Sequence, residues 1–302
     1  MILTRRELMA GAAASTAFGT VNAQSRRTAI VPFEHSAFPY DGPIPDTGKP
    51  FLEVSKDGKR GHTSPRGGVY FVEPTYSDRN TLLHLGANVT NGTLVVFFHG
   101  NNAKLAGEVV ARQRVPAQFD ASGLSGALVA PQMAVNALDS SAGRFWEAGF
   151  FANYLAEAAQ KLGQISGAGA GVFQRMPVVI VAYSGGYNPA AYVLQHGGAG
   201  SRIKGVVLLD ALFGEIPRIA QWVSANHTRA FFVSAYGPSS AGEHARLRAS
   251  LASAGVGVQD GAPQKLAGGG VWFIDSKGAS HNDFVTRAWV ANPLKDILSR
   301  MR

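Results

Sequence analysis

Ten residues decide the fold of this chain: Val178-Val179-Ile180-Val181-Ala182-Tyr183-Ser184-Gly185-Gly186-Tyr187. The β-branched apolar run predicts a buried strand, and the residues that follow favour a helix. Ala182 and Gly186 stand two positions on either side of Ser184. Their small size lets a sharp turn close in a strained conformation that lifts the serine hydroxyl above the sheet. The stretch therefore predicts a strand, a tight turn that presents one serine, and a helix.

Short apolar runs of the same kind recur along the chain, with helical patterns between them. Continuous apolar runs are typical of strands buried on both faces of a parallel sheet, and alternation of strands and helices indicates an α/β fold. An antiparallel pair is expected to open the sheet, at Gly68–Val72 and Leu82–Leu85. The further predicted strands are Leu94–Phe98, Ala127–Ala130, Val178–Ala182, Val206–Leu209, Ala230–Val233 and Val271–Ile274. The predicted helices are Gly107–Phe119, Phe145–Leu162, Asn188–His196, Glu215–Ser224, Glu243–Ala254 and Phe284–Met301.

The Ala-x-Ser-x-Gly turn resembles the nucleophile elbow of the α/β-hydrolase family, with Ala182 where glycine is commoner. The strand series over residues 67–302 is similar to that family's order, with Ser184 after the fifth strand. The resemblance implies an eight-stranded, mostly parallel sheet with helices on both faces. The connection after the sixth strand is too short for a large lid domain. The resemblance also implies a serine hydrolase that works through an acyl-enzyme.

A serine hydroxyl becomes a strong nucleophile only when a neighbouring base takes its proton and a third group orients that base. His281 lies in the loop between the last strand and the C-terminal helix, where the family carries its base. Seven other histidines lack a comparable position. Among them His99 ends the third strand, and we expect it to have a structural role near the oxyanion loop.

The acid that orients His281 has three candidates. The family usually carries it after the seventh strand, yet no carboxylate follows that strand until Glu243. Asp210 ends the sixth strand, where an ionised carboxylate is costly unless it is hydrogen-bonded, and some family members carry their acid there. Asp275 precedes His281 by six residues. We predict that Asp210 is the acid, with Glu243 and Asp275 as alternatives. If Asp210 is not catalytic, its expected role is that of a helix N-cap.

An oxyanion hole requires backbone N–H groups aimed at the developing negative charge. The residue after the nucleophile, Gly185, is the first expected donor. The loop after the third strand, Phe98-His99-Gly100-Asn101-Asn102, resembles the family's His-Gly oxyanion loop. We predict that Asn101 supplies the second donor, with Asn102 as the alternative. The asparagines would also suit an ordinary turn held by their own side chains.

Substrate contacts are predicted from residues near this edge of the sheet. Trp146 and Arg144 follow the fourth strand within the segment Pro131–Glu147, although aromatic residues beside a helix start often serve packing alone. Tyr183 and Tyr187 flank the serine and are expected to line the cleft.

The N-terminal residues predict an export signal. Thr4-Arg5-Arg6-Glu7-Leu8-Met9 matches a twin-arginine pattern, and a weakly apolar stretch leads to a cleavage site after Ala23. An ordinary secretory signal is the alternative. We therefore expect residues 1–23 to be a signal peptide, 24–66 an irregular extension and 67–302 the catalytic domain. The expected location is the periplasm or the exterior of a bacterium.

Composition limits the partners and cofactors. The formal charge of the chain is +8, but no basic run with interleaved aromatics indicates a nucleic-acid partner. No apolar run is long enough to span a bilayer. The chain has no cysteine, and no metal-binding or phosphate-loop motif is found. We expect no cofactor and no metal.

These observations predict an exported serine hydrolase that cleaves a carboxylic ester, small or polymeric, in preference to an amide. A non-catalytic binding protein on the same fold and an acyltransferase with the same three residues are the alternatives. Acyl length, alcohol group and oligomeric state do not follow from the sequence.

Overall fold

A nine-stranded central sheet forms the core of the computed structural model, which describes residues 27–266 and 268–302. The predicted signal peptide, residues 1–23, lies outside the described residues. The strand order is β1-β5-β7-β6-β8-β9-β10-β12-β11. The strands are β1 (Thr28–Pro32), β5 (Asn80–Leu85), β6 (Thr93–Phe98), β7 (Gly126–Pro131), β8 (Val178–Tyr183), β9 (Ile203–Leu209), β10 (Phe231–Tyr236), β11 (Gln259–Asp260) and β12 (Gly270–Asp275).

Only the first two strands are antiparallel to their neighbours, because β1 pairs with β5 and β5 with β7 in that sense. All other pairs are parallel. The expected α/β fold with a mostly parallel sheet is thus confirmed. The expectation that Gly68–Val72 opens this sheet is wrong, since β1 takes that place. The two-residue strand β11, which no apolar run predicts, brings the sheet to nine strands.

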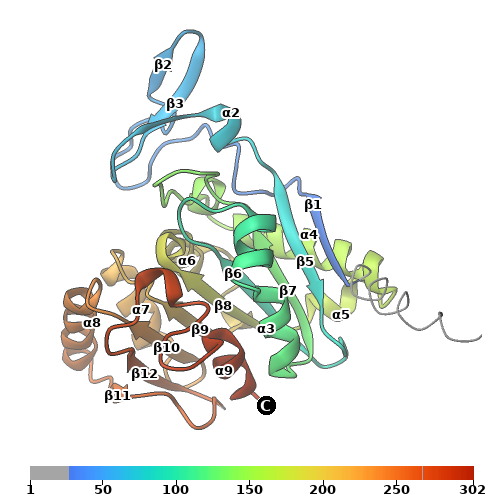
Figure 1. Ribbon diagram of the computed structural model, residues 1–302, viewed down its shortest axis with the longest axis vertical. Coiled ribbons are helices and arrows are strands. Elements are labelled where there is room, and N and C mark those ends of the chain that lie inside the picture. The colour runs from blue at the N-terminus through green and yellow to red at the C-terminus, as the bar shows by residue number, and fades with distance from the viewer. Residues whose placement is uncertain (1–26, 267) are drawn as a thin grey trace, which may run out of the picture.

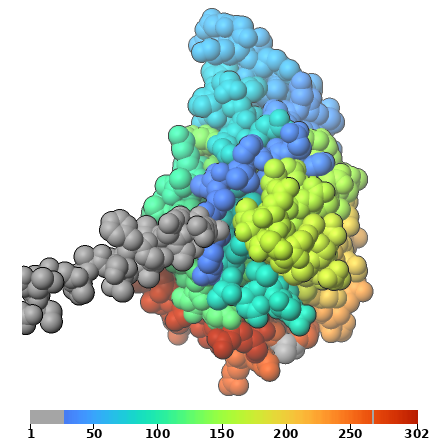
Figure 2. Space-filling view, turned by 90° about the vertical axis from the view of Figure 1, so that its right-hand side faces the viewer, coloured from blue at the N-terminus to red at the C-terminus, as the bar shows by residue number. Residues whose placement is uncertain are grey.

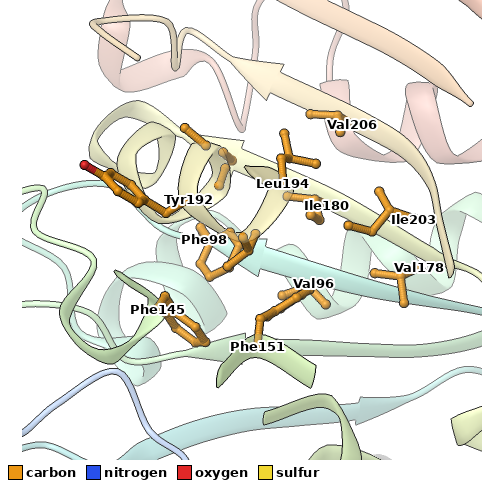
Figure 3. Close-up of a cluster of buried hydrophobic side chains, with 14 of the residues drawn as sticks. Val96, Phe98, Phe145, Phe151, Val178, Ile180, Tyr192, Leu194, Ile203 and Val206 are labelled. Carbon is orange, nitrogen blue, oxygen red and sulfur yellow. The ribbon is translucent and has the colours of Figure 1, made fainter. Parts of the chain in front are cut away.

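Helices cover both faces of the sheet, as side-chain alternation along the strands requires. On β8, Val178 and Ile180 point to the face covered by α4 to α8, and Val179 and Val181 to the face covered by α3 and α9. Figure 3 shows the first of these cores, where Phe145 and Phe151 lie against Phe98 at the end of β6. The helices are α3 (Val115–Ser122), α4 (Phe150–Ser166), α5 (Ala170–Gln174), α6 (Tyr187–His196), α7 (Ile216–Asn226), α8 (Ala241–Ser253) and α9 (Pro293–Ser299).

Two predicted helices are wrong in their extent. The segment predicted as Gly107–Phe119 is a π-helical stretch, Leu105–Arg112, followed by α3. Arg114 between them is left-handed, and Pro116 can only stand near a helix start. The C-terminal helix is confined to α9, because Asn292 is left-handed and Pro293 begins the helix. None of the described helices is long and apolar enough to cross a membrane.

The residues before β5 form a projecting arm, defined here as residues 50–75. It contains a three-stranded antiparallel sheet of β2 (Val54–Lys56), β3 (Lys59–Thr63) and β4 (Val69–Phe71), and the short turn α2 (Val72–Thr75). Figure 1 shows β2 and β3 standing apart from the central sheet. In Figure 2 the chain from β1 to the arm runs over the molecular surface beside α4. The expectation of an irregular extension over 24–66 is therefore wrong where β1, β2 and β3 lie.

The strand order places the predicted site residues together. β8 lies between β6 and β9, so the loops after these three parallel strands emerge side by side at one edge of the sheet. The chain leaves β6 for β7 on one side and later returns to β8 on the other. Such a reversal of strand order opens a crevice at the carboxyl ends of the strands, where open α/β sheets bind ligands.

Packing of the sheet predicts a stability effect at Gly205. A Cβ atom added there would overlap the Phe231 ring on β10. We expect Gly205→Ala to lower the free energy of unfolding by about 1–3 kcal/mol, the usual cost of overpacking. Gly242→Ala is the matched control, because that exposed position on α8 has nothing within 4 Å; it should be neutral or stabilising. Urea unfolding of both variants checks this, and equal stabilities would contradict the packing described.

Candidate active site

The turn after β8 presents Ser184 at the centre of the sheet edge. Ser184 is left-handed, with φ +52°, and α6 begins three residues later. A β-strand cannot pass into a helix over so few residues without such a sharp backbone reversal. Gly185 and Gly186 allow the close approach of the loop after β6. A Cβ atom at these positions would overlap the Asn101 side chain and the Phe98 carbonyl, respectively.

Ser184 begins a hydrogen-bonded chain of three side chains. Its Oγ lies 2.7 Å from Nε2 of His281, and Nδ1 of His281 lies 2.6 Å from Oδ2 of Asp210. Ser184 follows β8, Asp210 follows β9, and His281 lies in the loop after β12. The structure therefore brings together the three residues that the sequence singled out.

The Asp210 carboxylate is fully buried, and hydrogen bonds replace its water. The Ser240 hydroxyl donates to Oδ1, the Ser239 hydroxyl donates to Oδ2 at 3.1 Å, and the Gly237 N–H points at Oδ1 from 3.4 Å. Burial by itself raises the pKa of this carboxyl, but the hydrogen bonds from His281 and Ser240 outweigh burial and hold the pKa below its usual value. Asp210 is therefore ionised at neutral pH.

An ionised Asp210 fixes the tautomer of His281. A carboxylate can only accept hydrogen bonds, so Nδ1 of His281 carries a proton and donates it to Asp210. In the neutral imidazole the lone pair is then on Nε2, which faces the Ser184 hydroxyl. This is the arrangement in which the imidazole accepts the serine proton.

The two alternative acids are engaged elsewhere. Glu243 lies on α8 and pairs with Arg246 at 3.0 Å. Asp275 ends β12, where its Oδ1 accepts the Lys277 N–H at 2.8 Å. Asp210 alone of the three has a hydrogen bond to His281. The loop after β10 has no carboxylate bonded to His281 and supplies Ser239 and Ser240 to Asp210 instead.

The loop after β6 differs at its two candidate oxyanion donors, Asn101 and Asn102. The Asn102 N–H donates to the Ala137 carbonyl at 2.9 Å and is already used. The Gly100 carbonyl lies 2.7 Å from Nδ1 of His99. In a trans peptide the C=O of one residue and the N–H of the next point in opposite directions. The bond to His99 therefore turns the Asn101 N–H away from His99, and this geometry favours Asn101 over Asn102.

His99 holds that peptide from a buried position. Its Nε2 accepts the Met133 N–H at 2.9 Å, so the proton lies on Nδ1 and is donated to Gly100. Burial lowers the pKa of His99 and keeps the ring neutral. His99 thus links the loops after β6 and β7, in agreement with the structural role expected for it.

Of the residues predicted to contact the substrate, Tyr183 lies against His281, whereas Trp146, Arg144 and Tyr187 have other partners. Tyr183 stacks on the His281 ring, with centroids 5.4 Å apart, and its hydroxyl donates to the His281 carbonyl at 3.0 Å. Burial raises the pKa of Tyr183 to about 12. Trp146 is buried and donates to Asn188 at 3.2 Å, and Arg144 covers the Phe150 ring. Trp146 and Tyr187 line a separate cavity of about 140 Å³.

A cavity of about 440 Å³ lies over Ser184 and His281. Its volume suits a small organic ligand. Besides Ser184, His281, Tyr183 and Asn101, it is lined by residues that the sequence reasoning missed: Arg66 from the arm, Glu108 and Arg112 from the π-helical segment, and Leu138 from the loop after β7. Charged side chains far apart in sequence gave no signal of this convergence. In residues 27–266 and 268–302, no group of three His, Asp or Glu side chains is placed to hold a metal ion.

Comparisons with known proteins give likeness of structure only. The sequence matches no protein-family model, and no curated protein matches it. A mutant of the feruloyl esterase module from Clostridium thermocellum, complexed with sinapinate, is 11% identical over 89% of this chain and 98% of its own, with a TM-score of 0.43. Dienelactone hydrolase from Anabaena variabilis is 15% identical over 67% of this chain and 82% of its own, with a TM-score of 0.38.

An uncharacterised protein from Capnocytophaga ochracea is 14% identical over 80% of this chain, with a TM-score of 0.41. The match spans 62% of that protein's length. Solved structures similar to this chain thus include an esterase and a hydrolase, at low identity.

The geometry predicts which carboxylate supports the reactivity of Ser184. Asp210→Asn should slow labelling of Ser184 by a fluorophosphonate by about three orders of magnitude, because an amide no longer fixes the tautomer of His281. Asp275→Asn and Glu243→Gln should change the rate by less than about twofold, since both carboxylates are engaged elsewhere. Second-order labelling rates check this; a large loss in either control with Asp210→Asn unaffected would reassign the acid.

Proposed function

We propose that the protein is a serine hydrolase that cleaves carboxylic esters through an acyl-enzyme. The observation that carries the proposal is the continuous hydrogen-bonded chain from Ser184 through His281 to the buried Asp210. Three further features support the same chemistry: the strained turn at Ser184, the cavity above it, and the hydrogen bond from His99 that turns the Asn101 N–H away from His99.

Acylation begins when the ester carbonyl lies over Ser184 in the cavity. Nε2 of His281 takes the hydroxyl proton as Oγ attacks the carbonyl carbon. The Asp210 carboxylate stabilises the imidazolium that forms. The negative charge on the carbonyl oxygen is bound by the N–H groups of Gly185 and Asn101. His281 then gives the proton to the departing alcohol, and the acyl group stays on Ser184.

Deacylation repeats these steps with water. His281 takes a proton from a water molecule, whose oxygen attacks the acyl carbonyl, and the same two N–H groups bind the second oxyanion. Collapse of this intermediate returns the proton to Ser184 and releases the acid. An alcohol in place of water would make the same site an acyltransferase.

Hydrolysis of p-nitrophenyl butyrate tests the proposal. Wild type should release p-nitrophenolate with a transient acyl adduct in the intact mass, and Ser184→Ala should lose both, a fall of about a millionfold in the limit of complete loss of the nucleophile. Ser250→Ala is the control, since Ser250 is exposed on α8. Full activity in Ser184→Ala, or no adduct and no turnover in folded wild type, would contradict the proposal.

A further inference from the structure

The arm contributes to the cavity over Ser184 through one turn, residues 64–68, between β3 and β4. Hydrogen bonds within the turn fix its shape: the Ser64 N–H donates to the Gly68 carbonyl at 3.0 Å, and the Arg66 N–H donates to the Ser64 hydroxyl at 3.1 Å. The turn is also fixed to the loop after β7. The Ser64 hydroxyl donates to the Leu138 carbonyl at 2.6 Å, and the Leu138 N–H donates to the Tyr70 hydroxyl at 3.1 Å.

This attachment places the Arg66 side chain beside the reacting groups. Arg66 lines the same cavity as Ser184 and His281. Its guanidinium carbon lies 5.7 Å from the centre of the Phe213 ring, and that ring meets the His281 ring edge-on, 5.5 Å away. A ligand that fills the cavity therefore reaches both Ser184 and Arg66. Phe213 covers the guanidinium on one side and leaves the N–H groups at its edge for another partner.

Of the charged residues that line the cavity, Arg66 differs from Glu108 and Arg112 in its partners. Arg112, the other arginine of the lining, forms an ion pair with Glu108 and donates to the Asn282 carbonyl at 3.0 Å. Within the part of the chain that the structure describes, no ion pair includes Arg66. Arg66 also lines the neighbouring cavity with Asp46 and Asp139, but Asp46 pairs with Arg218 and Asp139 accepts hydrogen bonds from Tyr76 and Ser141. A guanidinium presents a planar fork of N–H donors that matches a carboxylate.

We propose that Arg66 binds a carboxylate of the substrate, so that the preferred ester carries a negative charge on its acyl or its alcohol part. This inference rests on the proposed function and specifies its substrate class. Arg66 is then a specificity residue, which stabilises the bound anionic ester and takes no part in the bond-breaking steps.

Two matched ester pairs test the proposal. In the first pair, mono-p-nitrophenyl glutarate has a carboxylate on its acyl part that p-nitrophenyl butyrate lacks. In the second pair, 4-acetoxybenzoate has a carboxylate on its alcohol part that phenyl acetate lacks. In at least one pair, Arg66→Gln should lower kcat/KM for the anionic ester about tenfold, mainly through KM, and leave the neutral ester unchanged within about twofold. Arg66→Lys should recover part of the loss, because it restores the charge but not the fork.

Lys59→Gln is the matched control. Lys59 is an exposed cation on β3 of the same arm and does not line the cavity, so its removal should leave both pairs unchanged. The proposal is overturned if Arg66→Gln leaves the anionic esters unaffected, or if it lowers kcat/KM equally for anionic and neutral esters.

Failure of the proposed function is distinguishable from failure of this inference. If wild type cleaves none of the four esters, the proposed function fails, and binding then decides the role of Arg66. Calorimetry with Ser184→Ala would compare monomethyl glutarate with dimethyl glutarate. Tighter binding of the monoester that disappears in Ser184→Ala/Arg66→Gln supports the assignment of Arg66, and equal binding of the two compounds overturns it.

Discussion

The Asp210 carboxylate lies at the end of β9 without access to solvent, and an ionised group there is stable only when hydrogen bonds replace its lost water. An uncompensated buried charge costs about 3–5 kcal/mol. Its partners come from two other loops: Ser239 and Ser240 after β10, and His281 after β12. The requirement of one buried charge thus fixes the relative positions of three strand ends. The position of His281, on which the proposed activation of Ser184 relies, depends on this interaction.

A second buried polar residue fixes the other half of the site in a similar way. His99 satisfies both ring nitrogens with backbone groups of the loops after β6 and β7. Because its partner is the Gly100 carbonyl, the following N–H group, that of Asn101, is turned away from the interior. In the proposed mechanism, the second oxyanion donor therefore depends on the direction of this one peptide unit.

Sequence reasoning succeeded where a pattern is local and failed where contacts join distant segments. The continuous apolar runs at Val178–Tyr183 and Ile203–Leu209 identify buried parallel strands, and the loops that follow them contain Ser184 and Asp210. β1 was missed because Thr28–Pro32 is short and stands in a polar, proline-rich region, where pairing with β5 supplies the stabilisation.

The arm and its arginine are a stronger case. Nothing in the sequence around Arg66 indicates a site, because its position depends on two hydrogen bonds that join Ser64 and Tyr70 with Leu138, more than sixty residues away. The partners of Asp210 were missed for the same reason: Ser239 and Ser240 look like turn residues until the sheet places them beside β9. Tertiary contacts, which the local pattern does not encode, decide both.

The most decisive measurement is a crystal structure of the protein after its reaction with a fluorophosphonate. We predict a covalent adduct on Ser184 whose phosphonyl oxygen lies about 2.7–3.1 Å from the backbone nitrogens of both Gly185 and Asn101, with His281 still bonded to Asp210. An adduct on another residue, or a phosphonyl oxygen that faces away from these two N–H groups, would contradict it.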